Sequence, residues 1–134
     1  MLKLTIIETI PQNQQRYPTC GDWQFERVHS GTRALVLKVK VSKTGDYKMD
    51  FLLSIHEYVE AVLCYFQGIA EESVDKFDLG WVEHDDITEP GDDPATPYHR
   101  QHRIADVIER LIATELGVDW ASYEKTLDNL DATL

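Results

Sequence analysis

The spacing of hydrophobic residues changes once along this chain, and that change limits the folds it can adopt. In the first 45 residues apolar and polar side chains alternate, which is the period of a half-buried β-strand. After Gly45-Asp46, apolar residues recur every three or four positions, which is the period of an amphipathic helix. Strands followed by helices predict an α+β fold in which the helices pack on one small sheet.

Three segments of the N-terminal part have the strand period: residues 1–10, 21–28 and 33–42. His29-Ser30-Gly31-Thr32 predicts a turn between the second and third segments. We therefore expect a small antiparallel sheet of about three strands.

Three to four helices are expected after residue 45. Residues 49–66 form the first, which Gly68 ends, and a short second helix begins at about Glu71 and is weakened by Gly80. Residues 98–116 form the strongest helix, which has a stripe of Ile104, Ile108, Leu111 and Ile112 and which Gly117 ends. Residues 118–130 form a short terminal helix. Between the second helix and the strongest one, residues 84–97 hold three prolines and five carboxylates and predict a solvated loop. The whole is expected to be one domain, 1–134, with strands in 1–45 and helices in 46–134.

The charge of the chain narrows the classes of partner. A formal charge of -11 opposes binding to nucleic acids and to anionic membranes, and suits a cation, a basic peptide or a basic protein partner. The exposed faces of the last predicted helix allow for a protein partner or a homo-oligomer. The sequence has no long apolar run and no signal-peptide pattern, so we expect a cytoplasmic protein. Cys20 and Cys64 have no metal-binding or redox spacing and are expected to be free thiols.

One polar pair stands out on the first predicted helix. His56 and Glu60 are four residues apart, so they lie one above the other on the helix, inside or beside the arc of Leu52, Val59 and Leu63. A carboxylate turned toward the interior needs a partner, which can be a metal ion, a basic side chain or a proton. The spacing predicts two ligands of one metal ion.

A further ligand is expected from the start of the strongest helix, in Pro97-Tyr98-His99-Arg100-Gln101-His102. On a helical wheel His102 and Glu109 lie near the edge of the apolar stripe, whereas His99 points to the opposite side. We therefore predict His102 as a ligand, and Glu109 as a ligand or as an acceptor of a ligand's hydrogen bond. Nitrogen and carboxylate ligands favour zinc first, and also suit manganese, iron or nickel.

The five residues from His56 to Glu60 resemble the HExxH helix of zincin metallopeptidases, with glutamate in place of the second histidine. The resemblance implies that His56 and Glu60 bind zinc and that Glu57 is the catalytic general base. Glu57 itself points about 100° away from His56 around the helix.

Two other resemblances lead to different expectations. Glu57-x-x-Glu60 followed by Glu72-x-x-Asp75 resembles the magnesium-binding carboxylates of nucleotide pyrophosphohydrolases of the MazG type, which implies diphosphate cleavage. The HExxE helix and the PYHxxH helix together resemble small uncharacterised proteins of bacteria and phages, which implies a prokaryotic or phage setting.

These patterns leave more than one function open. The leading hypothesis is a metal-binding domain, and within it a small metal-dependent hydrolase. In the alternative, His102, Arg103 or Arg110 neutralises Glu60, no metal binds, and the acidic protein is a non-catalytic interaction module.

Overall fold

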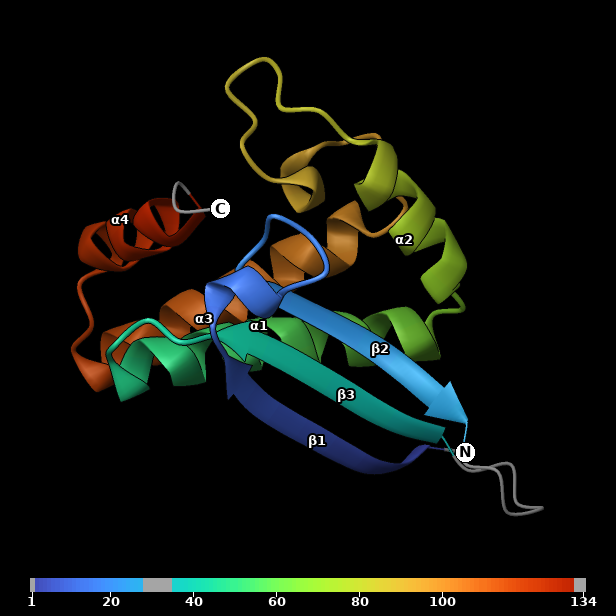
Figure 1. Ribbon diagram of the computed structural model, residues 1–134, viewed down its shortest axis with the longest axis horizontal. Helices are drawn as coiled ribbons and strands as arrows, with labels where there is room; N and C mark the ends of the chain where they lie inside the picture. Colours follow the sequence, from blue (N-terminus) through green and yellow to red (C-terminus); the bar gives the residue numbers. More distant parts are fainter. Residues whose placement is uncertain (1, 28–34, 132–134) are drawn as a thin grey trace.

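The computed structural model describes residues 2–27 and 35–131, and within them an α+β fold in which a three-stranded sheet is followed by four α-helices (Figure 1). The strands are β1 (Leu2–Ile10), β2 (Gly21–Arg27) and β3 (Leu35–Ser42). The helices are α1 (Tyr47–Phe66), α2 (Glu71–Gly80), α3 (His99–Leu116) and α4 (Trp120–Asp131). Two short 3-10 turns, η1 (Gln12–Gln14) and η2 (Pro90–Asp92), lie in the connections. The predicted fold class is therefore confirmed.

The sheet is mixed, so its predicted antiparallel pairing is wrong in one of its two ladders. The strand order is β1-β3-β2: β3 is antiparallel to β2 but parallel to β1. The reason is that β1 does not pair with the next strand in sequence. The chain crosses over by way of η1 and forms β2 at the far edge, which leaves the middle position for β3. The predicted turn at residues 29–32 falls outside the described residues.

The core lies between the sheet and α1. Leu37, Val39 and Val41 alternate along β3 and are fully buried. Leu52, Ala61 and Cys64 of α1 are equally inaccessible and belong to the same cluster. The helix begins at Asp46, whose carboxylate accepts hydrogen bonds from the backbone N–H groups of Lys48 and Met49.

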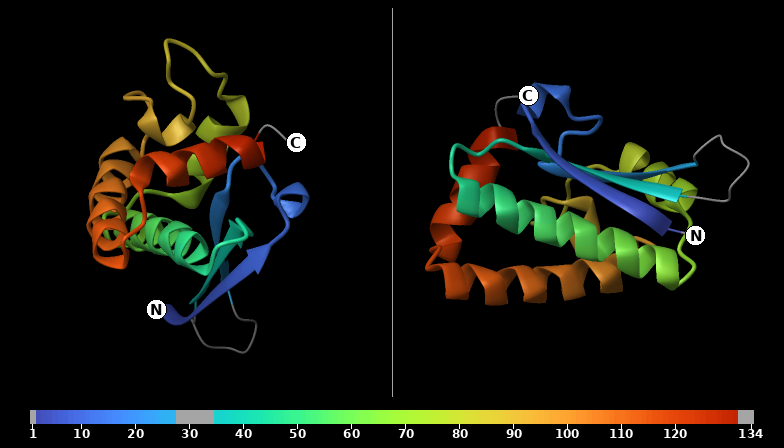
Figure 2. Two further views of the ribbon diagram at one scale, coloured as in Figure 1. Left: turned by 90° about the vertical axis from the view of Figure 1, so that its left-hand side faces the viewer. Right: turned by 90° about the horizontal axis from the view of Figure 1, so that it is seen from below.

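The molecule is layered, with α1 between the sheet and α3 (Figure 2, right). Helix α3 ends at Gly117, whose φ of 69° is favourable for glycine. The most buried face of α3 is not the predicted apolar stripe, because Leu111 is 66% exposed. The buried face instead consists of Gln101, His102, Ala105, Glu109 and Ala113.

Residues 84–97 are less solvated than the sequence predicts. Pro90, Gly91, Asp93 and Thr96 are buried, because η2 packs against the start of α3. Gly91 makes this approach close: a Cβ atom at this position would lie 2.4 Å from Nδ1 of His102. Across the described residues, no helix has both the length and the apolar character needed to cross a bilayer.

Candidate metal centre

Two packed helices bring the predicted ligands together. His56 and Glu60 lie one turn apart on α1, and His102 and Glu109 lie on the facing side of α3. All four are buried, with 5–7% of each residue exposed. Ala105 lies between the two α3 residues on the same face and is fully buried, so its small side chain lets the helices approach.

Three atoms from these side chains converge on one point. Nε2 of His56 lies 3.2 Å from Nδ1 of His102 and 3.2 Å from Oε2 of Glu60. Nδ1 of His102 lies 2.9 Å from the same carboxylate oxygen. Two nitrogens and one oxygen therefore form a nearly equilateral triangle, which we call the ligand triangle.

The other ring nitrogens of the two histidines face carboxylates. Nδ1 of His56 lies 2.9 Å from Oε1 of Glu109 and 3.2 Å from Oδ1 of Asp106. Nε2 of His102 lies 3.0 Å from Oδ1 of Asp92 in η2. Because a carboxylate accepts hydrogen bonds, these contacts place a proton on the outer nitrogen of each ring and turn the inner nitrogen toward the triangle.

The second oxygen of each buried carboxylate is also satisfied. The indole N–H of Trp23, on β2, donates to Oε1 of Glu60 at 3.0 Å. The hydroxyl of Tyr123, on α4, donates to Oε2 of Glu109 at 2.5 Å. Both aromatic side chains are buried, so the sheet and α4 fix carboxylates that lie on α1 and α3.

The titration of these groups reflects their contacts. Burial alone would lower the pKa of His102, but its hydrogen bonds to Asp92 and Glu60 raise it to about 10. Burial likewise opposes the charged form of His56, yet Asp106, Glu109 and Glu60 raise its pKa well above the usual value. For Glu60 burial would raise the pKa, and the two histidines lower it far below the normal range.

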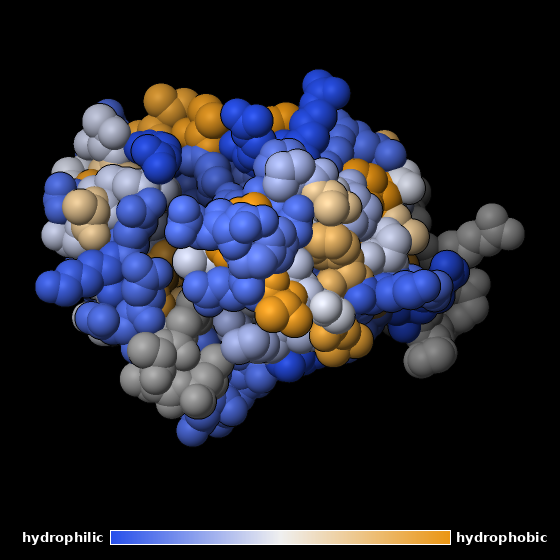
Figure 3. All heavy atoms as spheres, turned by 90° about the horizontal axis from the view of Figure 1, so that it is seen from above, coloured by the Kyte–Doolittle hydropathy of each residue, from blue (hydrophilic) through white to orange (hydrophobic). Residues whose placement is uncertain are grey.

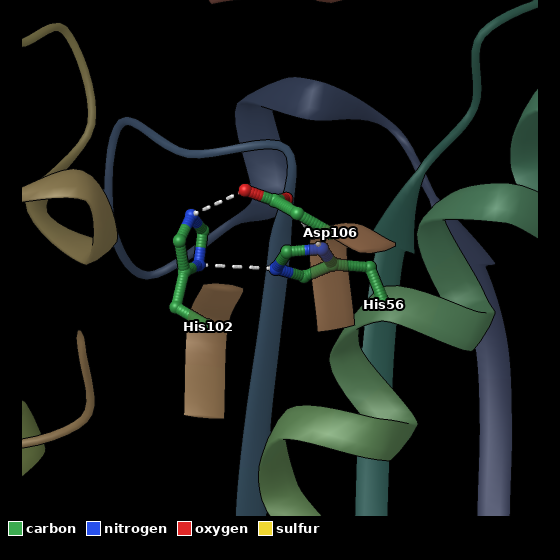
Figure 4. Close-up of side chains that lie close together, drawn as sticks. All are labelled: His56, His102 and Asp106. Atoms are coloured by element: carbon green, nitrogen blue, oxygen red, sulfur yellow. Dashed lines mark hydrogen bonds and ion pairs between the residues drawn. The ribbon is translucent and has the colours of Figure 1, made fainter. Parts of the chain in front are cut away.

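Asp106, Asp92 and Glu89 belong to the site although they were not predicted. His56, His102 and Asp106 offer ligand atoms within 4.8 Å of one another, as do Glu89, Asp92 and His102. Figure 4 shows the two rings directed toward each other, with the Asp106 carboxylate beside His102. One signal was available, because Asp106 follows His102 at the same four-residue spacing that relates Glu60 to His56.

Glu57, the predicted general base, lies outside the ligand triangle on the side of β2. Its carboxylate lies against Gly21, where a Cβ atom would be 2.4 Å from Oε1 of Glu57. Burial and the nearby charge of Glu60 raise the pKa of Glu57 well above the usual value. Glu57 and the three triangle residues line one cavity of about 390 Å³.

His99, His84 and Arg110 have partners outside the ligand triangle. The ring of His99 is at 3.1 Å from the backbone oxygen of Gly91, and His84 lies 3.0 Å from Asp93. Among the described residues, no Lys or Arg forms an ion pair with Glu60, and Arg110 instead lies 3.9 Å from Glu124. Of His102, Arg103 and Arg110, the basic side chains expected to neutralise Glu60, His102 contacts its carboxylate.

The chain was compared with protein-family models, with curated proteins and with solved structures. None of them matches it.

Proposed function

We propose that the protein binds a divalent transition-metal ion, with zinc as the first candidate, through the ligand triangle of His56, Glu60 and His102. The main observation in support of this proposal is that the two histidine nitrogens and the Glu60 oxygen lie 2.9–3.2 Å from one another. Ligands about 2.0–2.1 Å from a tetrahedral zinc ion lie roughly 3.3 Å from each other. The triangle therefore has close to the size of one face of such a coordination sphere.

The donor chemistry supports the same proposal. Two imidazole nitrogens and a carboxylate oxygen are the ligand types of zinc sites that keep a coordination position open for water. The carboxylates of Glu109 and Asp92 bind the outer N–H groups of the histidines, an arrangement that orients metal ligands and raises their basicity. In this proposal Glu109 orients His56 and is not itself a ligand.

We further propose that the centre belongs to a small metal-dependent hydrolase. An ion bound there would supply a water molecule of lowered pKa, the nucleophile of metal-assisted hydrolysis. Glu57 lines the same cavity and is the candidate for carrying the proton. Asp106, at 3.2 Å from His56 and 3.6 Å from His102, would hold both rings in position.

Two variants separate metal binding from catalysis. Glu57→Gln is expected to bind zinc like the wild-type chain and to lose hydrolysis of chromogenic ester and amide substrates, whereas Glu60→Gln is expected to lose both. Glu115→Gln removes one carboxylate from the exposed side of α3 and serves as the control. Full hydrolysis by Glu57→Gln would contradict its role, and unchanged zinc affinity in Glu60→Gln would contradict the metal centre.

A further inference from the structure

The cavity beside the ligand triangle has the size of a small-molecule site. Its volume of about 390 Å³ falls within the roughly 300–1,000 Å³ of typical ligand pockets. Its wall comes from several elements, including the segment before β2, α2, η2 and α4. The face that carries the 81–98 connection, α2 and α4 is largely hydrophilic, with scattered hydrophobic patches (Figure 3).

The cavity wall is strongly acidic. Of the described residues that line it, eleven are Asp or Glu, and Arg110 is the single Lys or Arg. The Arg110 guanidinium lies 4.5 Å from the ring centre of Trp120 and 3.9 Å from Glu124, so it is engaged by α4. A divalent ion at the triangle would balance only a small part of this negative charge.

Part of the acidic wall already holds a cation of this chain. The Arg16 guanidinium binds Asp22 at 2.6 Å and Asp75 at 3.2 Å. Glu57 and Asp78 line the same cavity and lie within electrostatic range of Asp22. Among the described residues neither forms an ion pair with a basic side chain, and the hydrogen-bond donor to Asp78 is the hydroxyl of Tyr98, at 2.7 Å.

Aromatic rings complete the wall near these carboxylates. Tyr17, Trp23 and Tyr98 line the cavity, and the Arg16 guanidinium lies 4.6 Å from the ring centre of Tyr17. Faces of aromatic rings attract organic cations, most strongly where water is excluded. Carboxylates and aromatic rings together are the surroundings that bind amine and guanidinium groups.

We propose that the cavity takes a small-molecule substrate with a positively charged amine or guanidinium group, which Asp78 binds while the reacting end of the substrate faces Glu57 and the ligand triangle. This inference rests on the proposed metal centre and names the substrate class of that centre. It argues against phosphate-rich substrates, which the acidic wall would repel. Burial also raises the pKa of Asp78 to about 7, so its ionised form is costly to the free protein and gains from a bound cation.

A pair of nearly isosteric probes tests the inference. Nα-acetyl-L-argininamide and Nα-acetyl-L-citrullinamide, in which acetylation removes the charge of the α-amino group, differ mainly in whether the end group is a charged guanidinium or a neutral urea. Each is titrated calorimetrically into zinc-loaded and zinc-free protein at low ionic strength, alongside inorganic pyrophosphate. We expect argininamide to bind at least about tenfold more tightly than citrullinamide, and less tightly as salt is added, because the preference comes from charge.

Two variants locate the binding. Asp78→Asn is expected to weaken argininamide binding by about fivefold, the usual size of a modest ion-pair contribution, while Glu115→Gln leaves it unchanged. Equal affinity for the two amides, tighter binding of pyrophosphate than of argininamide by the zinc-free protein, or binding of neither amide would overturn the inference. Zinc titrations of the same samples keep the two proposals apart: zinc binding without the amide preference refutes only the substrate class, and the preference without zinc binding refutes only the metal centre.

Discussion

Nε2 of His56 and Nδ1 of His102 lie 3.2 Å apart, although the two residues are 46 positions apart in sequence and on different helices. Each ring has a carboxylate on its outer nitrogen, and the inner nitrogens share Oε2 of Glu60. Two imidazoles held in this way present their inner nitrogens to one position, where an ion can replace the protons.

Replacing Trp23 with Phe is expected to destabilise the protein by about 1–3 kcal/mol, because Oε1 of buried Glu60 loses its donor. The affinity for zinc should also fall by about tenfold, since outer hydrogen bonds of ligands contribute on that scale. Urea unfolding and zinc titration measure the two effects. The control is Trp120→Phe, which removes the same N–H group from an exposed glutamate, Glu124, and should cost less than about 1 kcal/mol. Equal losses in the two variants would contradict the account.

A methyl group at Gly91 is expected to displace the His102 ring. The added Cβ would lie 2.4 Å from Nδ1, so Gly91→Ala should cost about 1–3 kcal/mol of stability, as overpacking does, and weaken zinc binding. At Gly80, the last residue of α2, no atom of the described residues beyond its chain neighbours and its own helix backbone lies within 4 Å of the corresponding position. Gly80→Ala should therefore be neutral or stabilising. Thermal unfolding of both variants, with and without zinc, checks the difference.

Asp78→Asn is expected to stabilise the protein in a pH-dependent manner. The pKa of Asp78 is about 7 in the folded chain, because of burial, against about 3.9 when unfolded. Between these values the folded chain binds more protons, so the free energy of unfolding falls as pH rises from about 4 to 7. The variant cannot ionise at this position, so its stability does not fall in this way. After allowing for solvent screening, its free energy of unfolding should exceed that of the wild type by about 1–2 kcal/mol at pH 8 and by little at pH 4. A difference that is the same at both pH values would refute the assignment.

The fold class could be predicted because the period of hydrophobic residues reports local structure directly. The alternation of Leu37, Val39 and Val41 identified a strand with one buried face, and Gly117 marked the end of α3. The partner of each strand could not be predicted, because alternation defines the two faces of a strand and not its neighbour. The parallel pairing of β1 with β3 depends on the crossover before β2.

Part of the candidate site could be predicted in the same way, because helical spacing shows which residues share a face of one helix. Helical spacing relates His56 to Glu60, and the helical wheel turned His102 rather than His99 toward α1, as the structure places them. Trp23, Tyr123 and Asp92 lie on β2, α4 and η2 and contact Glu60, Glu109 and His102. Local spacing could not predict these contacts, because they depend on how those elements pack in the folded protein. Asp106 could have been found, since it repeats the four-residue spacing on α3.

His102→Ala should reduce zinc affinity much more than His99→Ala does. Nδ1 of His102 is a corner of the ligand triangle, whereas the His99 ring binds the backbone oxygen of Gly91. We expect the loss of zinc affinity to be at least about tenfold larger for His102→Ala than for His99→Ala. Removing a hydrogen-bond partner of a ligand already lowers metal affinity by about 10–100-fold, and removing a ligand itself should cost no less. Calorimetric zinc titration of the two variants gives the comparison. Equal losses, or a larger loss for His99→Ala, would show that the ligand assignment is wrong.

The most direct test of the metal centre is the metal content of protein purified without an affinity tag, measured together with its uptake of added zinc. We predict an equimolar transition metal, or equimolar zinc uptake by the metal-free protein, that is lost in His56→Ala and Glu60→Ala and kept in His99→Ala. A protein that contains no metal, takes up none, and unfolds at the same temperature with and without a chelator would contradict the account.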